Sequence, residues 1–416
     1  MKYDVAVLGA GMIGVSCALH LQAKGKMVAL IDRREPGRET SYGNAGLIQR
    51  EATEPYEMPR KLSFLAGTAI NRRLDVRYHF GALASMAGPL YAYYRNSAGP
   101  AFAAISRDYA SIIALSLDTH TQLIRDANAE SLIGAQGYLT LHRTESELHE
   151  TYASADARVK LGVSHRKLDR AALAQEEPAL GDSFIGAVHW TDPISIKSPG
   201  DLVQAYANLF TERGGVFRFG DALSLQQAGA EEWQIQTADS GTISAKEIVV
   251  ALGPWSVMLT RRFGYTPPLF FKRGYHMHYA PVPGRTLNHW MIDGESGFVI
   301  CPMKDGLRLT TGAELAQVGA RMTPNQLERA EKVARRDFPL GERVEPQPWV
   351  GARPCMPDMK PVIGSVPGTP GLWCAFGHGH QGFTLGPATG ELLAAQMTGA
   401  QPRIDIAPFA PGRKFV

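Results

Sequence analysis

Residues 2–32 read KYDVAVLGAGMIGVSCALHLQAKGKMVALID, and this stretch decides the fold. Residues 3–8 are a short apolar run before a glycine, which is typical of a buried strand. Residues 13–23 carry apolar side chains at helical spacing, and residues 27–31 form a second apolar run. Strand, glycine turn, helix and strand, followed by an acid, make up the context that a dinucleotide-binding fingerprint requires.

The glycines of this stretch, Gly9, Gly11 and Gly14, form the pattern Gly-x-Gly-x-x-Gly. The first allows a sharp turn out of the strand, the second lets a pyrophosphate approach the backbone, and the third permits close packing of helix and strand. The start of the helix offers N–H groups and partial positive charge to phosphates. Asp32 then stands where an acid would accept hydrogen bonds from ribose hydroxyls. A glycine-rich turn with no ligand is the alternative, and the fingerprint does not distinguish FAD from NAD.

Composition indicates an ordinary globular protein. The chain has 416 residues, of which 44% are hydrophobic and 20% charged, which is enough for two domains with cores of their own. Its 43 lysines and arginines nearly balance 40 aspartates and glutamates, so we expect no nucleic-acid partner. The first strand leaves no room for a signal peptide, and four scattered cysteines suit a reducing compartment. The sequence therefore predicts a cytoplasmic protein.

One stretch leaves contact with a membrane open. Residues 80–94 are uncharged but are interrupted by Gly81, Gly88 and Pro89. We expect a packed helix pair in the core here. The alternative is a surface that lines the substrate cavity or docks peripherally on the inner face of the membrane. We predict no metal site, because the pairs His276/His278 and His378/His380 lack evident further ligands, although zinc or copper at either pair stays open.

The rest of the chain predicts further elements of both kinds. Helices are expected at 107–127, from Thr144, from Ser198-Pro199, after Thr323-Pro324 and at 385–397. Strands are expected at 137–142, 186–190, 216–219, 233–237, 242–245, 247–252, 272–280, 297–303, 307–314, 361–364 and 372–376. The strands between 272 and 314 look antiparallel, so they predict a second sheet.

Several motifs, taken in order, resemble the D-amino acid oxidase superfamily of flavoproteins, and within it the bacterial D-amino acid dehydrogenases. The motifs are the N-terminal fingerprint, Thr40-Ser41-x-x-Asn44-Ala45-Gly46, Ala251-x-Gly253-x-Trp255-Ser256, Ala352-Arg353-Pro354-x-x-Pro357-Asp358 and Gly377-His378-Gly379-His380-x-Gly382. The resemblance implies non-covalent FAD and oxidation of an amine next to a carboxylate. Two residues depart from the family, since Asp32 replaces the usual glutamate and Ala352 the usual leucine.

The resemblance also implies how the chain is divided. We expect an α/β protein with a Rossmann-like FAD-binding domain, made of residues 1–55, 198–258 and 350–416. The remaining residues, 56–197 and 259–349, would form an α+β substrate-binding domain with a mixed or antiparallel sheet.

The FAD-binding residues implied by these motifs lie in four stretches. They are Gly9, Gly11, Met12, Ile13, Gly14, Asp32 and Arg33; Thr40, Ser41, Asn44, Ala45 and Gly46; Ala251, Gly253 and Trp255; and Gly377, Gly379, His380, Gly382, Phe383 and Thr384. In the last stretch, N–H groups before a helix would stabilise the negative charge of a reduced flavin.

Three residues are candidates for substrate binding and catalysis. Arg353 offers the planar fork that grips a carboxylate, as it does in the resembled family, and a structural ion pair with Asp358 or a contact with a helix end is the alternative. Tyr275 would share the carboxylate, unless it is an ordinary half-buried strand tyrosine. His380 would lie over the flavin or line the substrate site, whereas His378 is expected to pack. By strand alternation, His276 and His278 point away from Tyr275.

The function that follows is FAD-dependent oxidative deamination of D-amino acids, with cyclic ones such as D-proline or hydroxy-D-proline included. Hydride would pass from Cα to flavin N5, and the electrons to a quinone or another acceptor. A sarcosine or glycine oxidase that uses oxygen is the alternative within the superfamily. An NAD-binding or regulatory module is the alternative of a different class.

Overall fold

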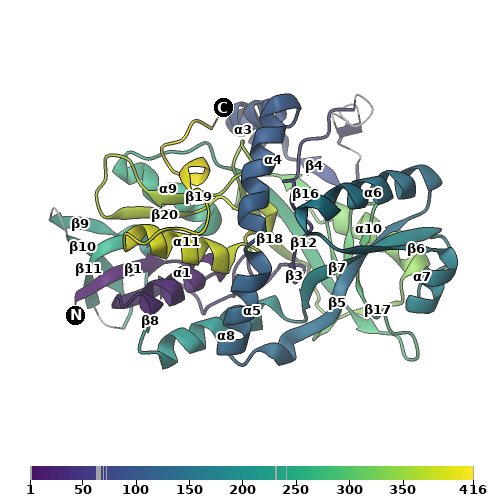
Figure 1. The fold of residues 1–416 in the computed structure, drawn as a ribbon, viewed down its shortest axis with the longest axis horizontal. Helices are drawn as coiled ribbons and strands as arrows, with labels where there is room; N and C mark the ends of the chain where they lie inside the picture. The colour runs from purple at the N-terminus through teal and green to yellow at the C-terminus, as the bar shows by residue number, and fades with distance from the viewer. Residues whose placement is uncertain are drawn as a thin grey trace.

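Two sheets lie side by side in the molecule, and each carries its own helices (Figure 1). The structure is a computed structural model that describes residues 2–61, 67–68, 70–71, 73–229, 232–239 and 241–415. The first sheet has the central order β19-β20-β11-β1-β2-β8, and β10 and β9 extend it beside β11. Its strands are β1 (Lys2–Leu8), β2 (Val28–Asp32), β8 (Val216–Phe219), β9 (Gln226–Gly229), β10 (Glu232–Thr237), β11 (Gly241–Val250), β19 (Val362–Ser365) and β20 (Leu372–Phe376).

The central strands of this sheet other than β19 run parallel, as the sequence predicts for a Rossmann-like unit. β1 pairs in parallel with β11 and β2, β2 with β8, and β11 with β20. Helices cover one face: α1 (Met12–Ala23), α5 (Ser116–Asp126), α8 (Pro199–Glu212) and α11 (Gly386–Met397). α1 and α11 pack so closely that a Cβ on Gly390 would lie 2.6 Å from the backbone of Ser16.

The second sheet is mixed but mainly antiparallel, which confirms the predicted fold class. Its strands are β3 (Leu47–Ile48), β4 (Val76–Tyr78), β5 (Ile133–His142), β6 (His165–Asp169), β7 (Gly186–Ile196), β12 (Phe270–Pro281), β13 (Trp290–Asp293), β14 (Val299–Met303), β15 (Gly306–Thr310), β16 (Ala313–Leu315), β17 (Leu340–Arg343) and β18 (Trp349–Cys355). Among the described strands of this second sheet, only the pairs β5–β13 and β4–β16 are parallel. The helices α6 (Glu145–Arg158), α7 (Arg170–Glu176) and α10 (Asn325–Asp337) flank it.

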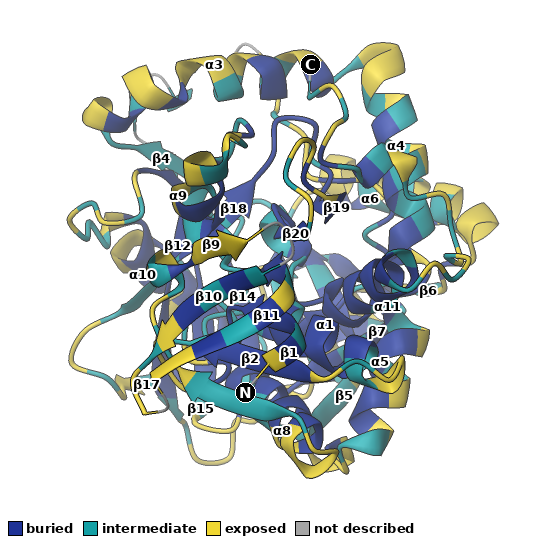
Figure 2. Cartoon of the chain, turned by 90° about the vertical axis from the view of Figure 1, so that its left-hand side faces the viewer, coloured by how far each residue is buried: buried dark blue, intermediate teal, exposed yellow. Residues whose placement is uncertain are grey.

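Two helical predictions are wrong. Residues 80–94 form one helix, α3 (Phe80–Asn96), with Pro89 inside it, and not a packed pair in the core. α3 crosses one end of the molecule, and much of it is exposed (Figure 2). It remains helical because solvent can satisfy the backbone carbonyl that Pro89 leaves without a donor. The predicted helix at 107–127 is two helices, α4 (Gly99–Ile113) and α5, because the chain turns at residues 114–115.

Two strands also differ from the sequence patterns. The runs 242–245 and 247–252 form the single strand β11, whose first half pairs with β10 and whose second half pairs with β20. The run 307–314 is divided between β15 and β16. The short helix α9 (Ser256–Thr260) follows β11. Among the described residues, none of the helices has both the length and the apolar character that a membrane span needs.

The proposed division into two domains stays a prediction, and the sheets cross its boundaries in two places. β3 and β18 belong to the second sheet, although the division assigns Leu47–Ile48 and most of Trp349–Cys355 to the FAD-binding domain. β3 and β18 thereby place residues from early and from late in the sequence beside the cavity described next.

Candidate active site

The carboxyl ends of the parallel strands open into one cavity. Gly9 follows β1, Asp32 ends β2, Ala251 follows β11 and Gly377 follows β20, and all of them line this cavity. It has a volume of about 950 Å³ and continues to the second sheet, where residues of β12, β15 and β18 form its wall. This volume is at the upper end of the ~300–1,000 Å³ of small-molecule sites, which suits a dinucleotide together with a small substrate.

The glycine turn has the close contacts that the fingerprint predicts. Gly9 has a φ of 109°, and a Cβ there would lie 2.4 Å from the carbonyl oxygen of Ala251. A Cβ on Gly14 would lie 1.7 Å from the carbonyl oxygen of Gly9. α1 then begins at Met12 with no side chain capping it from Gly11. Apart from the N–H of Met12, which donates to Ser41, the first N–H groups of the helix have no capping side chain and are available to phosphates at the cavity wall.

Asp32 is held by the backbone at the edge of the cavity. Its carboxylate accepts hydrogen bonds from the N–H groups of Ala10 (2.7 Å) and Arg34 (3.0 Å). Next to it, the guanidinium of Arg33 lies 4.7 Å from the ring centre of Trp255. All three predicted residues at this end, Asp32, Arg33 and Trp255, line the cavity.

The loop of residues 40–46 is held by α1 and by the second sheet. The hydroxyl of Ser41 accepts a hydrogen bond from the N–H of Met12 (3.0 Å). From the second sheet, Arg308 donates to the carbonyl of Asn44 (2.7 Å), and the indole of Trp290 donates to that of Ala45 (2.8 Å). The loop is therefore a rigid part of the cavity wall.

Most of the predicted site residues line the cavity. They are Gly9, Gly11, Met12, Ile13, Asp32, Arg33, Thr40, Ser41, Asn44, Ala45, Ala251, Gly253, Trp255, Tyr275, Arg353, Gly377, Gly379, His380, Gly382 and Phe383. Gly14, Gly46 and Thr384 are not in the lining. Instead, Gly46 lies against Ile196, and the hydroxyl of Thr384 donates to the carbonyl of Leu47 (3.2 Å), so these residues support the wall.

Arg353 faces the cavity from β18 without an acidic partner. Its guanidinium donates to the carbonyls of Gly312 (2.9 Å) and Thr311 (3.4 Å), and within the described part of the chain it forms no ion pair. Asp358, the partner in the alternative interpretation, pairs with Arg413 at 2.7 Å. Burial lowers the pKa of Arg353, because the charged form loses hydration.

Lys272 stands directly opposite Arg353 in the register of β12 and β18, and the sequence analysis missed it. Opposite residues of an antiparallel pair share a face, so two cations lie side by side. The ammonium of Lys272 donates to the hydroxyl of Tyr93 (2.8 Å), which donates to the carbonyl of Tyr56 (2.5 Å). Lys272 likewise has no ion pair within the described ranges. Arg353, Lys272, Tyr93 and Tyr56 all line the cavity. Like charges held together without an acid make a site for an anion.

Tyr275 is placed differently from the expectation. By strand alternation it lies on the face of β12 opposite to Lys272, and it is 1% exposed. Its hydroxyl is 2.9 Å from a carboxylate oxygen of Glu314 and accepts from the N–H of Thr323 (2.8 Å). Because the O–H proton is donated to Glu314, gripping a substrate carboxylate would require this network to open. Its predicted role stays a prediction.

His380 forms another part of the wall, in a short 3₁₀ turn (Gly379–Gln381). Its ring centre is 4.6 Å from that of Tyr56, a residue that the sequence analysis did not single out. Burial holds the pKa of His380 well below its usual range, and the charges of Arg353 and Lys272 lower it further. His380 is therefore neutral near pH 7. His378 packs as expected, with Nε2 2.9 Å from the hydroxyl of Thr389.

Behind the cavity lies a buried carboxyl group that the sequence did not indicate. Gln49 lines the cavity, and its amide donates to Glu51 (2.7 Å), to which Tyr138 also donates (2.9 Å). Glu51 is only 4% exposed, and burial raises the pKa of its carboxyl to about 7. Nothing in its local sequence distinguishes this glutamate from those on the surface.

Comparison with known proteins agrees with this geometry. The family model described as FAD dependent oxidoreductase (DAO) matches residues 4–396. A protein of Chromohalobacter salexigens named D-amino acid dehydrogenase is 30% identical over 97% of both chains, and one of Bradyrhizobium diazoefficiens named D-amino-acid oxidase is 30% identical over 98% of both.

Solved structures show the same fold at lower identity. Glycine oxidase from Geobacillus kaustophilus superposes with a TM-score of 0.74 at 22% identity, covering 99% of both chains. Iminodiacetate oxidase from Chelativorans sp. superposes with a TM-score of 0.73 at 21% identity, covering 98% of both chains.

Proposed function

The chain belongs to the DAO family of FAD-dependent oxidoreductases, and we propose that within this family it is a D-amino acid dehydrogenase. Curated relatives with that name match it over nearly their full length, at about 30% identity. The proposal extends to cyclic substrates such as D-proline and hydroxy-D-proline, and to a quinone or another acceptor in place of oxygen.

The observation that carries the proposal is the pair of cations at the cavity wall. Arg353 and Lys272 are opposite each other on β18 and β12 and have no acidic partner within the described part of the chain. A carboxylate between them would satisfy both through charge-assisted hydrogen bonds. Gly274 makes room for this arrangement, since a Cβ there would lie 2.7 Å from Nη2 of Arg353. We therefore assign the α-carboxylate of the substrate to this position.

The chain's own residues orient the substrate. FAD, when bound, supplies the hydride acceptor for the Cα–H bond. Arg353 and Lys272 fix the carboxylate, and His380, neutral because it is buried, borders the same space without adding charge. The positive wall favours an uncharged substrate amine, which is the form that can lose hydride from Cα. The imino acid product hydrolyses to a 2-oxo acid and ammonia, whereas a cyclic amino acid yields a cyclic imine.

The test is flavin reduction without oxygen. The purified yellow protein is mixed anaerobically with matched D- and L-amino acids, D-proline, cis-4-hydroxy-D-proline, sarcosine and glycine, and the flavin band is followed. We expect bleaching with D forms and not with their L forms. Reduction by sarcosine or glycine alone would instead make the protein an amine oxidase of the kind seen among the structural relatives.

A second measurement separates dehydrogenase from oxidase. The reduced protein is mixed with air-saturated buffer, or with a soluble quinone, and reoxidation of the flavin is timed. We expect the quinone to be the faster acceptor by at least an order of magnitude. Rapid reoxidation by oxygen with formation of peroxide would contradict the dehydrogenase assignment and leave the substrate assignment intact.

A further inference from the structure

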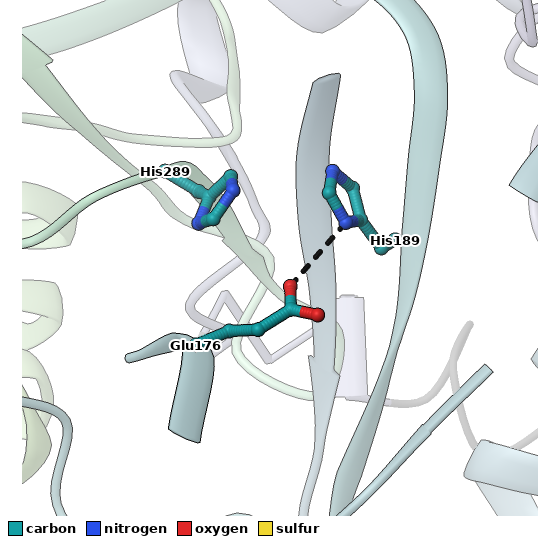
Figure 3. A group of neighbouring side chains, drawn as sticks. All are labelled: Glu176, His189 and His289. Carbon is teal, nitrogen blue, oxygen red and sulfur yellow. Dashed lines mark ion pairs between the residues drawn. The ribbon is translucent and has the colours of Figure 1, made fainter. Parts of the chain in front are cut away.

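A group of two histidines and a glutamate lies outside the active-site cavity. His189 comes from β7, Glu176 ends α7 and His289 immediately precedes β13. Figure 3 shows their side chains converging on one space from three separate segments. One nitrogen of each histidine and one oxygen of Glu176 all lie within 4.8 Å of one another. None of the three belongs to the residues that line the active-site cavity.

His189 directs an unprotonated nitrogen into this space. The carbonyl of Gln136 lies 3.2 Å from Nε2, and a carbonyl only accepts, so Nε2 carries the proton of the neutral ring. Nδ1 is then left with a lone pair. It is buried and has no hydrogen-bond partner among the described residues, and the residue as a whole is 7% exposed.

The backbone around His189 is shaped to hold the ring in this orientation. The register of β5 against β7 shifts around Gln136, so its carbonyl faces Nε2. Gly137 follows with a φ of 73°, and a Cβ there would lie 2.9 Å from Nε2. A glycine therefore leaves room for the imidazole, and the irregularity in β5 supplies its hydrogen bond.

Glu176 faces the lone pair of His189. Its Oε2 lies 3.4 Å from Nδ1, so two acceptors oppose each other with no proton between them in the neutral ring. In a tetrahedral zinc site with bonds of 2.0–2.1 Å, two ligand atoms are about 3.4 Å apart. The pair already has the spacing of two ligands of one metal ion.

His289 is oriented by a buried carboxylate. Its Nδ1 donates to Glu177 (2.6 Å), which also accepts from the backbone N–H of His289 (2.8 Å) and from that of Asn288 (3.0 Å). A carboxylate behind the far nitrogen is the usual support of a histidine that ligates a metal, because it fixes the tautomer and the ring. Nε2 of His289 is thereby left as its ligand atom. The rings of His289 and His189 have their centres 4.9 Å apart.

We infer that Glu176, His189 and His289 form a binding site for a divalent transition-metal ion of the zinc class. Two imidazoles and one carboxylate suit zinc, and the partial exposure of Glu176 and His289, 19% and 17% of their side chains, leaves a fourth position for water. The ion supplies the positive charge that the facing acceptors lack, and His289 moves inward to complete the tetrahedron. The site ties α7 to β7 and to the start of β13.

One neighbour competes with the metal. Arg166 on β6, opposite His189 in the register, holds the other oxygen of Glu176 at 2.6 Å and is 57% exposed in its side chain. Its charge weakens metal binding without blocking Oε2. Arg166→Ala removes this competing cation and leaves all three ligands in place. The proposal therefore predicts that this variant binds the metal more tightly than the wild type.

The test measures metal binding to the FAD-loaded, untagged protein after chelator treatment and dialysis. Zinc is titrated calorimetrically, and zinc retained after desalting is counted per chain. We expect one ion per chain, with affinity at least about tenfold lower in His289→Ala and in Glu176→Gln, and higher in Arg166→Ala. Zinc should also raise the melting temperature of the wild type and not that of His289→Ala.

Two controls make the outcome decisive. His149→Ala removes an exposed histidine that lies 3.8 Å from Glu145, and it should bind zinc like the wild type. Glu147→Gln alters the other group of possible ligands, His142, Glu147 and Glu295, and should also leave binding unchanged. No retained zinc in the wild type, equal affinity in His289→Ala and Glu176→Gln, or loss of binding in Glu147→Gln would each overturn the site.

Discussion

The glycine turn at residues 9–14 and the cation pair Lys272–Arg353 line the same cavity but arise differently. In the turn, residues that are neighbours in the sequence create the site: Gly9 has a φ of 109°, and a Cβ on Gly14 would lie 1.7 Å from the carbonyl oxygen of Gly9. The cation pair exists only because β12 and β18 pair in one register. A local pattern therefore predicts where the cofactor binds, whereas the proposed position of the substrate depends on long-range strand pairing.

The largest expected effect is in the turn. Gly14→Ala places a Cβ 1.7 Å from the carbonyl oxygen of Gly9, so α1 must move away from β1. Overpacking of this kind typically costs about 1–3 kcal/mol or more, and here it also displaces the first N–H groups of the helix. We expect protein with no bound flavin and a lower melting temperature. The ratio of flavin to protein absorbance measures the first effect, and thermal unfolding of the apoprotein the second.

Gly11→Ala is the matched comparison. Its Cβ would lie 3.3 Å from the hydroxyl of Ser41, which is tight but tolerable, and Gly11 lines the cavity whereas Gly14 does not. This variant should fold normally and bind FAD more weakly. If both variants retain flavin as the wild type does, the turn is not the cofactor site.

Arg353→Leu should produce the next largest effect, and it tests the other region. Removing one charged partner of a buried carboxylate costs about 2–5 kcal/mol. We therefore expect kcat/KM for a D-amino acid to fall by roughly 30- to 5,000-fold. The protein should stay yellow, because Arg353 stands apart from the glycine turn. Steady-state kinetics and the flavin spectrum separate these two expectations.

The conservative variant Arg353→Lys sharpens this result. Lysine keeps the charge but loses the planar fork, so it should recover only part of the activity. Loss of flavin in both variants would show that Arg353 supports the cofactor instead of the substrate.

Sequence reasoning succeeded where the determining contacts are local. β8 and β20 have the predicted limits, and α1 and β2 differ by one residue from theirs, because apolar periodicity and glycines define them. It failed at α3, where an apolar run with Gly81, Gly88 and Pro89 is equally compatible with a broken helix pair.

The residues of the candidate site also divide into those with a local sequence signal and those without one. Most of the residues predicted to bind the cofactor come from contiguous motifs, and they line the cavity. Lys272, proposed to bind the substrate, was not found from the sequence. A lysine near the start of a strand resembles an ordinary solvated residue until its partner across the sheet is known. Glu51 and the group of Glu176, His189 and His289 carry no local signal either, since burial and convergence of distant segments create their chemistry.

Lys272→Met should have a smaller effect than Arg353→Leu. The ammonium is a point charge that already donates to Tyr93, so a substrate carboxylate gains less from it than from a guanidinium fork. We expect about a tenfold rise in KM, equivalent to about 1.4 kcal/mol, with little change in kcat. Steady-state kinetics with one D-amino acid and its amide measures this, because the amide lacks the charge that Lys272 binds.

The double variant tests whether the two cations act on one group. If both bind the same carboxylate, the loss in Lys272→Met combined with Arg353→Leu should be smaller than the sum of the single losses. Strict additivity would show that they contact different parts of the substrate, and the cation pair would no longer be a single anion site.

Glu51→Gln should change turnover least, and it tests the hidden electrostatics behind the cavity. Burial raises the pKa of the folded-state carboxyl to about 7, above its ordinary value of about 4.3. Between these values the folded protein binds more protons than the unfolded chain, so stability falls as pH rises. Glutamine keeps an oxygen that accepts from Tyr138 and Gln49, but it does not titrate, so it removes this fall in stability. The substitution should therefore raise the free energy of unfolding by about 1–3 kcal/mol above pH 7.

The measurement is the melting temperature of both proteins from pH 5 to pH 8, with Glu145→Gln, an exposed glutamate, as the matched control. The difference between wild type and Glu51→Gln should widen across this window, while that for Glu145→Gln stays flat. Parallel curves for Glu51→Gln would mean that the carboxyl titrates normally and that water or a cation reaches it. In that case the pKa of Glu51 would follow from its residue type alone and not from its burial. Its behaviour could then be predicted from the sequence, as that of the glycine turn can.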